Sequence, residues 1–144
     1  MTCVSEVMTA PVVTVNRLTP YKEIARLLTR HKISGLPVVL VDQRVAGVIS
    51  EADLVAARDR DARRARAGAA ARRQWHGVQG HAVLLAGELM TAPAVTIRPD
   101  ETVATAARVM TAYRVSRLPV VANDGTLVGI VSQGDLLRAL ASPA

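Results

Sequence analysis

Two short segments of the sequence place a hydroxyl and a carboxylate three residues apart at the start of an expected helix. They are Ser50-Glu51-Ala52-Asp53 and Ser132-Gln133-Gly134-Asp135. In a capping box, the serine oxygen accepts from the N–H of the third helical residue, and the acidic side chain accepts from the serine N–H. A nucleotide could use the same groups, because a helix N-terminus suits a phosphate and a carboxylate suits the two ribose hydroxyls. Capping alone explains both residues, so the nucleotide role needs further support.

A candidate phosphate-binding cation stands near one of these segments only. Arg117 lies within Val115-Ser116-Arg117-Leu118-Pro119, whereas the matching stretch Ile33-Ser34-Gly35-Leu36-Pro37 has glycine at that position. A guanidinium offers two parallel donors to a phosphate. We therefore expect the two halves to differ in anion affinity, and we expect the better phosphate site to contain Arg117, Ser132 and Asp135.

These segments occur twice because the sequence is an internal duplication with an offset of 82 residues. Met8 to Val55 aligns without gaps to Met90 to Leu137, and 19 of the 48 positions are identical. An open solenoid needs three or more units. Each half is too small to be comfortably stable alone, so we expect two halves packed face to face about a pseudo-twofold axis. The predicted divisions are repeat 1 at 1–57, a linker at 58–85 and repeat 2 at 86–144.

Each repeat is predicted to contain strand, helix, strand, strand and helix, which is an α/β fold with a three-stranded sheet per copy. A short helical turn within 4–11 comes first and ends before Pro11. Thr19 is expected to cap the next helix, with Pro20 in its first turn. The elements predicted in the first copy are strands at 12–15, 36–41 and 45–49 and helices from Pro20 to His31 and after Ser50.

The region between the copies is rich in alanine and arginine, and its helix propensity predicts that the helix after Asp53 continues into it. Glycines from Gly77 onward then interrupt the helix. Much of the formal net charge of +6 lies in this region, which leaves an anionic partner such as nucleic acid open. Only three aromatic residues occur in the whole sequence, which argues against a stacking platform for single strands.

The composition also suggests a compartment. Cys3 is the only cysteine, so no internal disulfide can form, and a reducing environment fits. The first residues show neither a basic segment nor an apolar core of the secretory type, and no apolar run has the length of a membrane span. We expect a cytoplasmic location without membrane insertion.

An enzymatic role finds little support in the sequence. No nucleophile elbow, Walker loop or dinucleotide fingerprint is present. His31 lies on the apolar stripe of its predicted helix, where we expect it to be partly buried. His76 and His81 lie in a glycine-rich connector without a cysteine or carboxylate cluster, so we expect no metal site, no required cofactor and no catalysis.

Three motifs in constant order resemble the cystathionine-β-synthase (CBS) domain, here as a tandem pair. They are Met-Thr-x-Pro before a β-branched strand, hydrophobic-Ser-x-Leu-Pro-Val-Val, and Gly-hydrophobic-hydrophobic-Ser-x-x-Asp-Leu. The resemblance covers residues 4–57 and 86–141. It implies the β-α-β-β-α fold, with two clefts between the repeats that commonly bind AMP, ADP, ATP or S-adenosylmethionine for regulation.

Carried over by motif position, the resemblance implies a set of ligand-binding residues. Asp53 and Asp135 would hold the ribose, while Ser50 and Ser132 would meet phosphate, with Arg117 beside Ser132. Gly35 in the position of Arg117 leaves full nucleotide binding in the first cleft open. The remaining residues would line the adenine pocket or its connector: Val13, Thr14, Ile33, Ser34, Gly35, Pro37, Val95, Thr96, Val115, Ser116 and Pro119.

Three functions stay open on the sequence. The first is a regulatory sensor of adenosine compounds that forms a homodimer and signals to an unidentified regulated protein. The second is a dimerisation scaffold without a ligand, since apolar positions occur on both helices of each half. The third is a nucleic-acid-binding protein that uses the basic linker to contact duplex phosphates.

Overall fold

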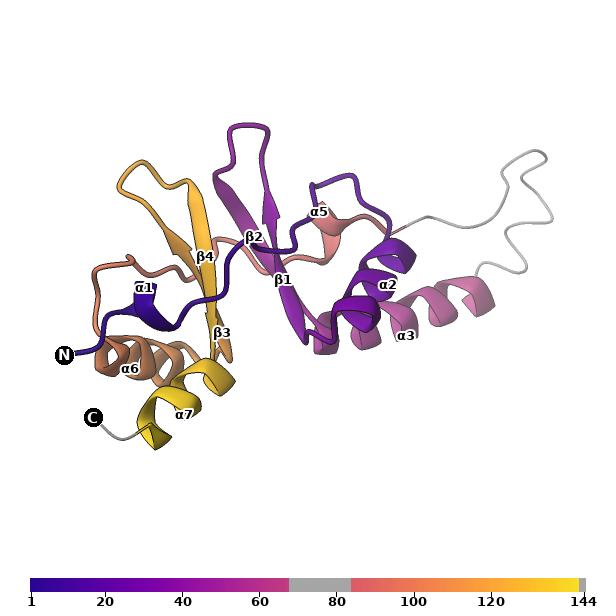
Figure 1. The fold of residues 1–144 in the computed structure, drawn as a ribbon. Coiled ribbons are helices and arrows are strands. Elements are labelled where there is room, and N and C mark those ends of the chain that lie inside the picture. Colours follow the sequence, from indigo (N-terminus) through magenta and orange to yellow (C-terminus); the bar gives the residue numbers. More distant parts are fainter. Residues whose placement is uncertain (68–83, 143–144) are drawn as a thin grey trace.

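The computed structural model describes the backbone of residues 1–67 and 84–142 and the side chains of residues 1–59 and 84–142. Two β-hairpins lie side by side at the centre of the molecule, and the longer helices lie on the two outer flanks (Figure 1). The first repeat contains α2 (Tyr21–His31), β1 (Gly35–Val39), β2 (Val45–Ser50) and α3 (Glu51–Ala67). The second contains α6 (Val103–Tyr113), β3 (Arg117–Val121), β4 (Leu127–Ser132) and α7 (Gln133–Ala141).

The two hairpins have the same antiparallel register. Gly35 pairs with Ser50 in the first, and Arg117 pairs with Ser132 in the second. Gly125 closes the second hairpin at φ 87°, as its turn sequence predicts. In the first hairpin Gln43 adopts φ 68° instead. This register brings each Ser-x-x-Asp segment to the same end of its hairpin, beside the residue at the start of the preceding strand.

The predicted third strand of each sheet is wrong in extent. Within 12–15 only Val15 joins a sheet, through a parallel bridge to Val38 in which the Val39 N–H donates to the Val15 carbonyl at 2.8 Å. Just before this segment, Thr9 pairs with Ile130 of the second repeat. The chain therefore crosses from one repeat to the other along this segment, and only its end reaches β1. Ile97 makes the equivalent single bridge to Val120.

The two repeats exchange their first helices. Helix α1 (Val4–Val7) packs on the second repeat, where the Val4 N–H donates to the Glu101 carbonyl at 2.8 Å. Helix α5 (Ala86–Leu89) packs on the first repeat, where the Ala86 N–H donates to the Thr19 carbonyl at 2.8 Å. Figure 1 shows the indigo α1 beside α6 and α7, far from the rest of its own repeat.

The exchange is completed in the hydrophobic cores. Val4 is fully buried and belongs to the core of the second repeat, with Ile97, Met110, Leu118 and Val131. The first core is completed in the same way by Ala86 and Leu89 of the other repeat, together with Leu84 just before them. Removing either segment would expose the apolar core of the other repeat, so the exchange joins the halves into one unit.

Some predicted helix features are corrected by the structure. Pro20, not Thr19, is the N-cap of α2, and the Thr19 hydroxyl instead accepts from the Asn16 N–H at 3.2 Å. His31 is exposed because it is the last residue of α2, beyond the buried part of the apolar stripe. Helix α3 continues to Ala67, which confirms that the helix after Asp53 extends into the linker. Trp75, His76, Gly77, Gly80 and His81 lie outside the described residues.

Candidate functional site

Both Ser-x-x-Asp segments form capping boxes at the N-termini of α3 and α7. The Ser50 N–H donates to Asp53 Oδ2 at 2.8 Å, and the Asp53 N–H donates to Ser50 Oγ at 3.2 Å. Ser132 and Asp135 repeat the arrangement at the same two distances. The predicted capping role is confirmed. Because a carboxylate has two oxygens, capping uses only one of them, and the other can make a further contact.

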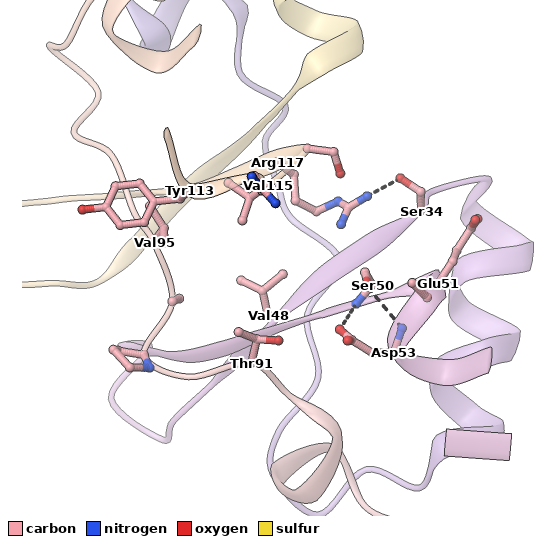
Figure 2. A pocket seen from close by; sticks show the side chains of 15 residues that line it. Ser34, Val48, Ser50, Glu51, Asp53, Thr91, Val95, Tyr113, Val115 and Arg117 are labelled. Atoms are coloured by element: carbon pink, nitrogen blue, oxygen red, sulfur yellow. Dashed lines mark hydrogen bonds between the residues drawn. The ribbon is translucent and has the colours of Figure 1, made fainter. Parts of the chain in front are cut away.

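A cavity of about 510 Å³ lies beside the first capping box, which we call the first cleft. Figure 2 shows Ser50, Glu51 and Asp53 at one side of it, with Val95, Val115 and Tyr113 at the opposite side. The first cleft therefore has a polar end on the first repeat and an apolar end on the second. Its other lining residues are Ser34, Val48, Ala52, Thr91, Pro93, Ala94, Arg114, Ser116 and Arg117.

A second cavity, of about 630 Å³, lies beside the capping box of α7, and we call it the second cleft. Thr9, Ile130, Ser132 and Asp135 line it in the places that Thr91, Val48, Ser50 and Asp53 take in the first cleft, at the offset of 82 residues. The duplication thus extends to the cavities. The other lining residues are Leu28, Thr29, Lys32, Ile33, Ser34, Gly35, Glu51, Arg117 and Arg138.

Arg117 lines both clefts. It begins β3 and its backbone pairs with Ser132, but its side chain extends across to the first repeat (Figure 2). There Nη2 donates to Ser34 Oγ at 2.5 Å. Burial lowers the pKa of the Arg117 guanidinium, while the negative charges of Glu51 and Asp53 act in the opposite direction. Arginine keeps its charge near neutral pH, so a half-buried cation stands between the two clefts.

The two cleft aspartates differ in their partners. Asp135 is only 7% exposed, and its Oδ1 forms an ion pair with Arg138, one turn later on α7. The corresponding position on α3 is Ala56, which carries no charge. The carboxylate of the second cleft is therefore bound by both its capping contact and an arginine, whereas the first repeat has no counterpart of that arginine.

Most of the predicted site residues line one of the clefts. The first cleft includes Ser34, Ser50, Asp53, Val95, Val115, Ser116 and Arg117. The second includes Ile33, Ser34, Gly35, Arg117, Ser132 and Asp135.

Five predicted residues line neither cleft. Pro37 and Pro119 are fully buried because they occupy the middle of β1 and β3. Val13 packs against the first core, and Thr14 lines a separate cavity of about 430 Å³. Thr96 is exposed immediately before the Ile97 bridge.

Several cleft residues were missed by the sequence reasoning. Thr9 and Thr91 belong to the repeated Met-Thr-Ala-Pro motif, so the repetition itself was a usable signal. Tyr113 and Arg114 stand at the end of α6, and Lys32 is the counterpart of Arg114. These positions come directly before a predicted pocket segment, and Tyr113 is 64% exposed.

Within residues 1–67 and 84–142, no helix has the length and apolar character needed to cross a membrane. The same residues hold no group of three or more histidine, cysteine or acidic side chains that could bind a metal ion. The clefts offer hydroxyls, carboxylates, guanidiniums, the Lys32 ammonium, the Tyr113 ring and aliphatic walls.

The fold and the two clefts define a class of protein built from paired β-α-β-β-α repeats with a binding cavity beside each capping box. The chain belongs to the CBS domain family, because the model of that domain matches residues 4–60 and 86–142. The α/β fold of two such repeats, packed as one module, is thereby confirmed, as is the resemblance seen in the sequence.

Curated relatives show the same domain in proteins of different size. The chain is 29% identical to the uncharacterized protein MJ1426 of Methanocaldococcus jannaschii, over 82% of this chain and 79% of the relative. It is 30% identical to the chloroplastic CBS domain-containing protein CBSX1 of Arabidopsis thaliana, over 87% of this chain and 57% of that protein. It is 28% identical to inosine-5'-monophosphate dehydrogenase of Korarchaeum cryptofilum, of which it spans only 23%.

Solved structures of similar proteins contain ligands of different kinds. CBSX2 of Arabidopsis thaliana, solved in complex with AMP, superposes with a TM-score of 0.76 at 28% identity, over 97% of this chain and 96% of that one. The CBS domain pair of MJ0100, solved with 5'-methylthioadenosine and S-adenosyl-L-methionine, has a TM-score of 0.75 at 27% identity and the same coverage. Hypoxic Response Protein I, solved with two zinc ions, has a TM-score of 0.72 at 25% identity, over 99% and 100%.

Proposed function

We propose that this protein is a regulatory module that binds adenosine-containing ligands, such as AMP, ADP, ATP or S-adenosylmethionine, in the clefts between its repeats. The observation that carries this proposal is the position of Asp53 and Asp135. Each carboxylate uses one oxygen to cap a helix and also lines a cavity of about 510 or 630 Å³. Pockets of this size accommodate small-molecule ligands and cofactors.

The two ends of the first cleft suit the two ends of a nucleotide. Val95, Val115 and Tyr113 offer apolar surface for a purine ring. Asp53 at the other end accepts hydrogen bonds from ribose hydroxyls, and the N-terminus of α3 with Arg117 attracts a phosphate. Similar structures bind AMP or S-adenosyl-L-methionine, which supports the same ligand class here.

A regulatory module has to pass the effect of ligand binding to a partner, and the outer helices offer a surface for such a partner. Val55 on α3 and Leu137 on α7 are equivalent by the repeat offset, and both are well exposed, at 71% and 67%. Leu140 on α7 is 73% exposed. We propose that a second copy of the chain covers these apolar residues in a homodimer, without catalysis by the module itself. Equilibrium sedimentation of the protein and of Leu137→Lys tests this dimer, and a monomeric wild type would contradict it.

A thermal-shift panel with AMP, ADP, ATP and S-adenosylmethionine tests the ligand class. A ligand that binds only the folded state, at 100 times its Kd, stabilises it by about 2.7 kcal/mol and raises the midpoint. Calorimetry on Asp53→Asn and Asp135→Asn then assigns the clefts. Each substitution keeps an oxygen for the cap but removes the charge, and should weaken its cleft about tenfold, since hydrogen bonds to charged groups contribute about 1.5–3 kcal/mol.

Asp42→Asn is the matched control, because Asp42 caps the turn of the first hairpin and lines neither cleft. It should leave every Kd unchanged. A thermal midpoint that none of the four compounds moves would contradict the sensor and leave the dimerisation scaffold. Binding to duplex DNA that weakens steeply with salt would favour the linker-based alternative.

A further inference from the structure

A single arginine occupies a place where the duplication would put two. Gly35 and Arg117 are equivalent at the offset of 82 residues, and they begin β1 and β3. A Cβ atom on residue 35 would lie 2.5 Å from Arg117 Cζ and Nη1, so the guanidinium fills the space beside Gly35. With a side chain on residue 35, the guanidinium could not keep this position. The two clefts therefore have one central cation between them.

The two clefts meet at this cation. Ser34, Glu51 and Arg117 line both cavities. Arg117 donates one hydrogen bond to Ser34 Oγ at 2.5 Å. A guanidinium has five N–H donors, so the others are available to a ligand. Glu51 is the carboxylate common to both cavities, and it opposes the loss of charge on the buried guanidinium.

Each of the other described cations that line the clefts lines only one of them. Arg114 lines the first cleft only. Lys32 and Arg138 line the second only, and Arg138 is paired with Asp135. Among residues 1–59 and 84–142, Arg117 is thus the one cation that can reach a phosphate in either cavity.

We propose that Arg117 is a shared phosphate ligand, and that phosphate-bearing ligands in the two clefts compete for it, so that occupancy of one cleft weakens the other. This inference rests on the proposed adenosine-binding function. A planar guanidinium binds one phosphate with two parallel hydrogen bonds. A second phosphate finds these donors engaged and meets the negative charge of the first. A ligand without phosphate feels neither effect, so the coupling is selective for charged adenosine compounds.

The shared role is tested with Arg117→Ala, titrated with AMP and with adenosine. Amide resonances of Thr91 and Thr9 report the two clefts separately, because each residue lines only one of them. We expect the AMP Kd to rise about tenfold in both clefts, since a charged hydrogen bond is lost in each. We expect the adenosine Kd to stay unchanged. The control Arg114→Ala removes the same charge but should weaken AMP only at the Thr91 cleft.

The competition is tested with one cleft blocked. Val48→Trp and Ile130→Trp are equivalent by the repeat offset and fill the first and second clefts without a change of charge. Each variant gives the AMP Kd of the open cleft alone. We expect the product of the two Kd values in the wild type to exceed the product from the blocked variants about tenfold, within the usual range of coupling between sites. With adenosine, which carries no phosphate, the two products should agree.

Several results would overturn the inference while leaving the proposed function intact. The first is an AMP Kd that Arg117→Ala changes in one cleft only. The second is a product of the two AMP Kd values in the wild type that equals the product from the blocked variants. The third is coupling between the clefts that persists with adenosine. If a tryptophan variant does not fold, the AMP titration curves of Thr91 and Thr9 in the unblocked protein show whether binding in one cleft weakens binding in the other. Absence of binding by adenosine and by all four compounds, AMP, ADP, ATP and S-adenosylmethionine, would instead overturn both the inference and the function on which it rests.

Discussion

Asp135 forms an ion pair with Arg138, whereas its counterpart Asp53 is followed at the same spacing by Ala56. The Asp135 carboxylate is 7% exposed, and the Arg138 side chain is 74% exposed. Solvent therefore reaches the arginine side of the pair and weakens it. A ribose that approaches Asp135 has to share this carboxylate with Arg138, while a ribose at Asp53 meets no equivalent competitor on α3. The duplication has left two similar clefts with unequal access to their carboxylates.

Replacement of this arginine should strengthen the second cleft for a ligand without phosphate. Arg138→Ala frees the outer oxygen of Asp135, so we expect the Kd of adenosine in the second cleft to fall about threefold, the size of effect usual for an exposed ion pair. The converse variant Ala56→Arg introduces the same spacing on α3 and should weaken adenosine in the first cleft. Calorimetry with adenosine measures both, and a change of the same sign in the two variants would contradict this explanation.

A methyl group at Gly35 should displace the Arg117 guanidinium, because the added Cβ would lie 2.5 Å from its Cζ. The guanidinium is the end of a flexible side chain and can move away, so we expect Gly35→Ala to lower the free energy of unfolding by only about 1 kcal/mol, through loss of the hydrogen bond to Ser34, and to weaken AMP in both clefts. Gly134→Ala is the control, since the nearest atoms to its added Cβ are 3.6 Å away. Gly134 lies in the first turn of α7, where alanine should be neutral or stabilising. Urea denaturation and calorimetry separate the two effects.

The exchange of first helices predicts where a mutation at the N-terminus acts. Val4 is fully buried in the core of the second repeat. We expect Val4→Ala to lower the free energy of unfolding by about 2 kcal/mol, because it leaves a cavity. Val41→Ala, at a fully exposed valine, should change stability by less than about 0.5 kcal/mol. Hydrogen exchange should show the loss of protection in α6, α7 and β4, and a loss confined to the first repeat would contradict the exchange.

The second hairpin turn predicts a dependence of stability on pH. Asp124 accepts hydrogen bonds from the side chain and the N–H of Thr126, and these hold the pKa of its carboxyl below the ordinary value. A carboxyl with a lowered folded-state pKa stabilises the protein above the unfolded-state pKa, and this contribution disappears as the pH falls through the folded-state pKa. Thr126→Val should therefore be less stable than the wild type at neutral pH.

Denaturation at several pH values measures this difference. The gap between Thr126→Val and the wild type should stay constant above about pH 5 and shrink below about pH 4. The control is Thr111→Val, whose hydroxyl donates to the Ala107 carbonyl and touches no carboxylate, so its effect should not vary with pH. An NMR titration of Asp124 should show a higher pKa in Thr126→Val, and an unchanged pKa would contradict the explanation.

Features that depend on neighbouring residues were predictable from the sequence. The capping boxes of Ser50 with Asp53 and of Ser132 with Asp135 form because both partners lie within one helical turn. The hairpin turn at Gly125 and the continuation of α3 into the alanine-rich linker depend on local backbone preference in the same way. The repeat itself was visible because both copies kept their residue types at a constant offset.

Tertiary structure alone decided which segments meet. The β-branched residues predict a full strand at 12–15, but this segment joins β1 only at Val15, because the chain leading to it pairs with the other repeat at Thr9. The sequence associated Arg117 with the adjacent Ser132, yet its side chain bonds to Ser34, 83 residues away, because Gly35 leaves room for it. Contacts of this kind depend on how the two cores pack after each repeat has formed its own elements. The amino-acid sequence determined the parts and their duplication, and the packing of the halves determined that one arginine serves the space between two clefts.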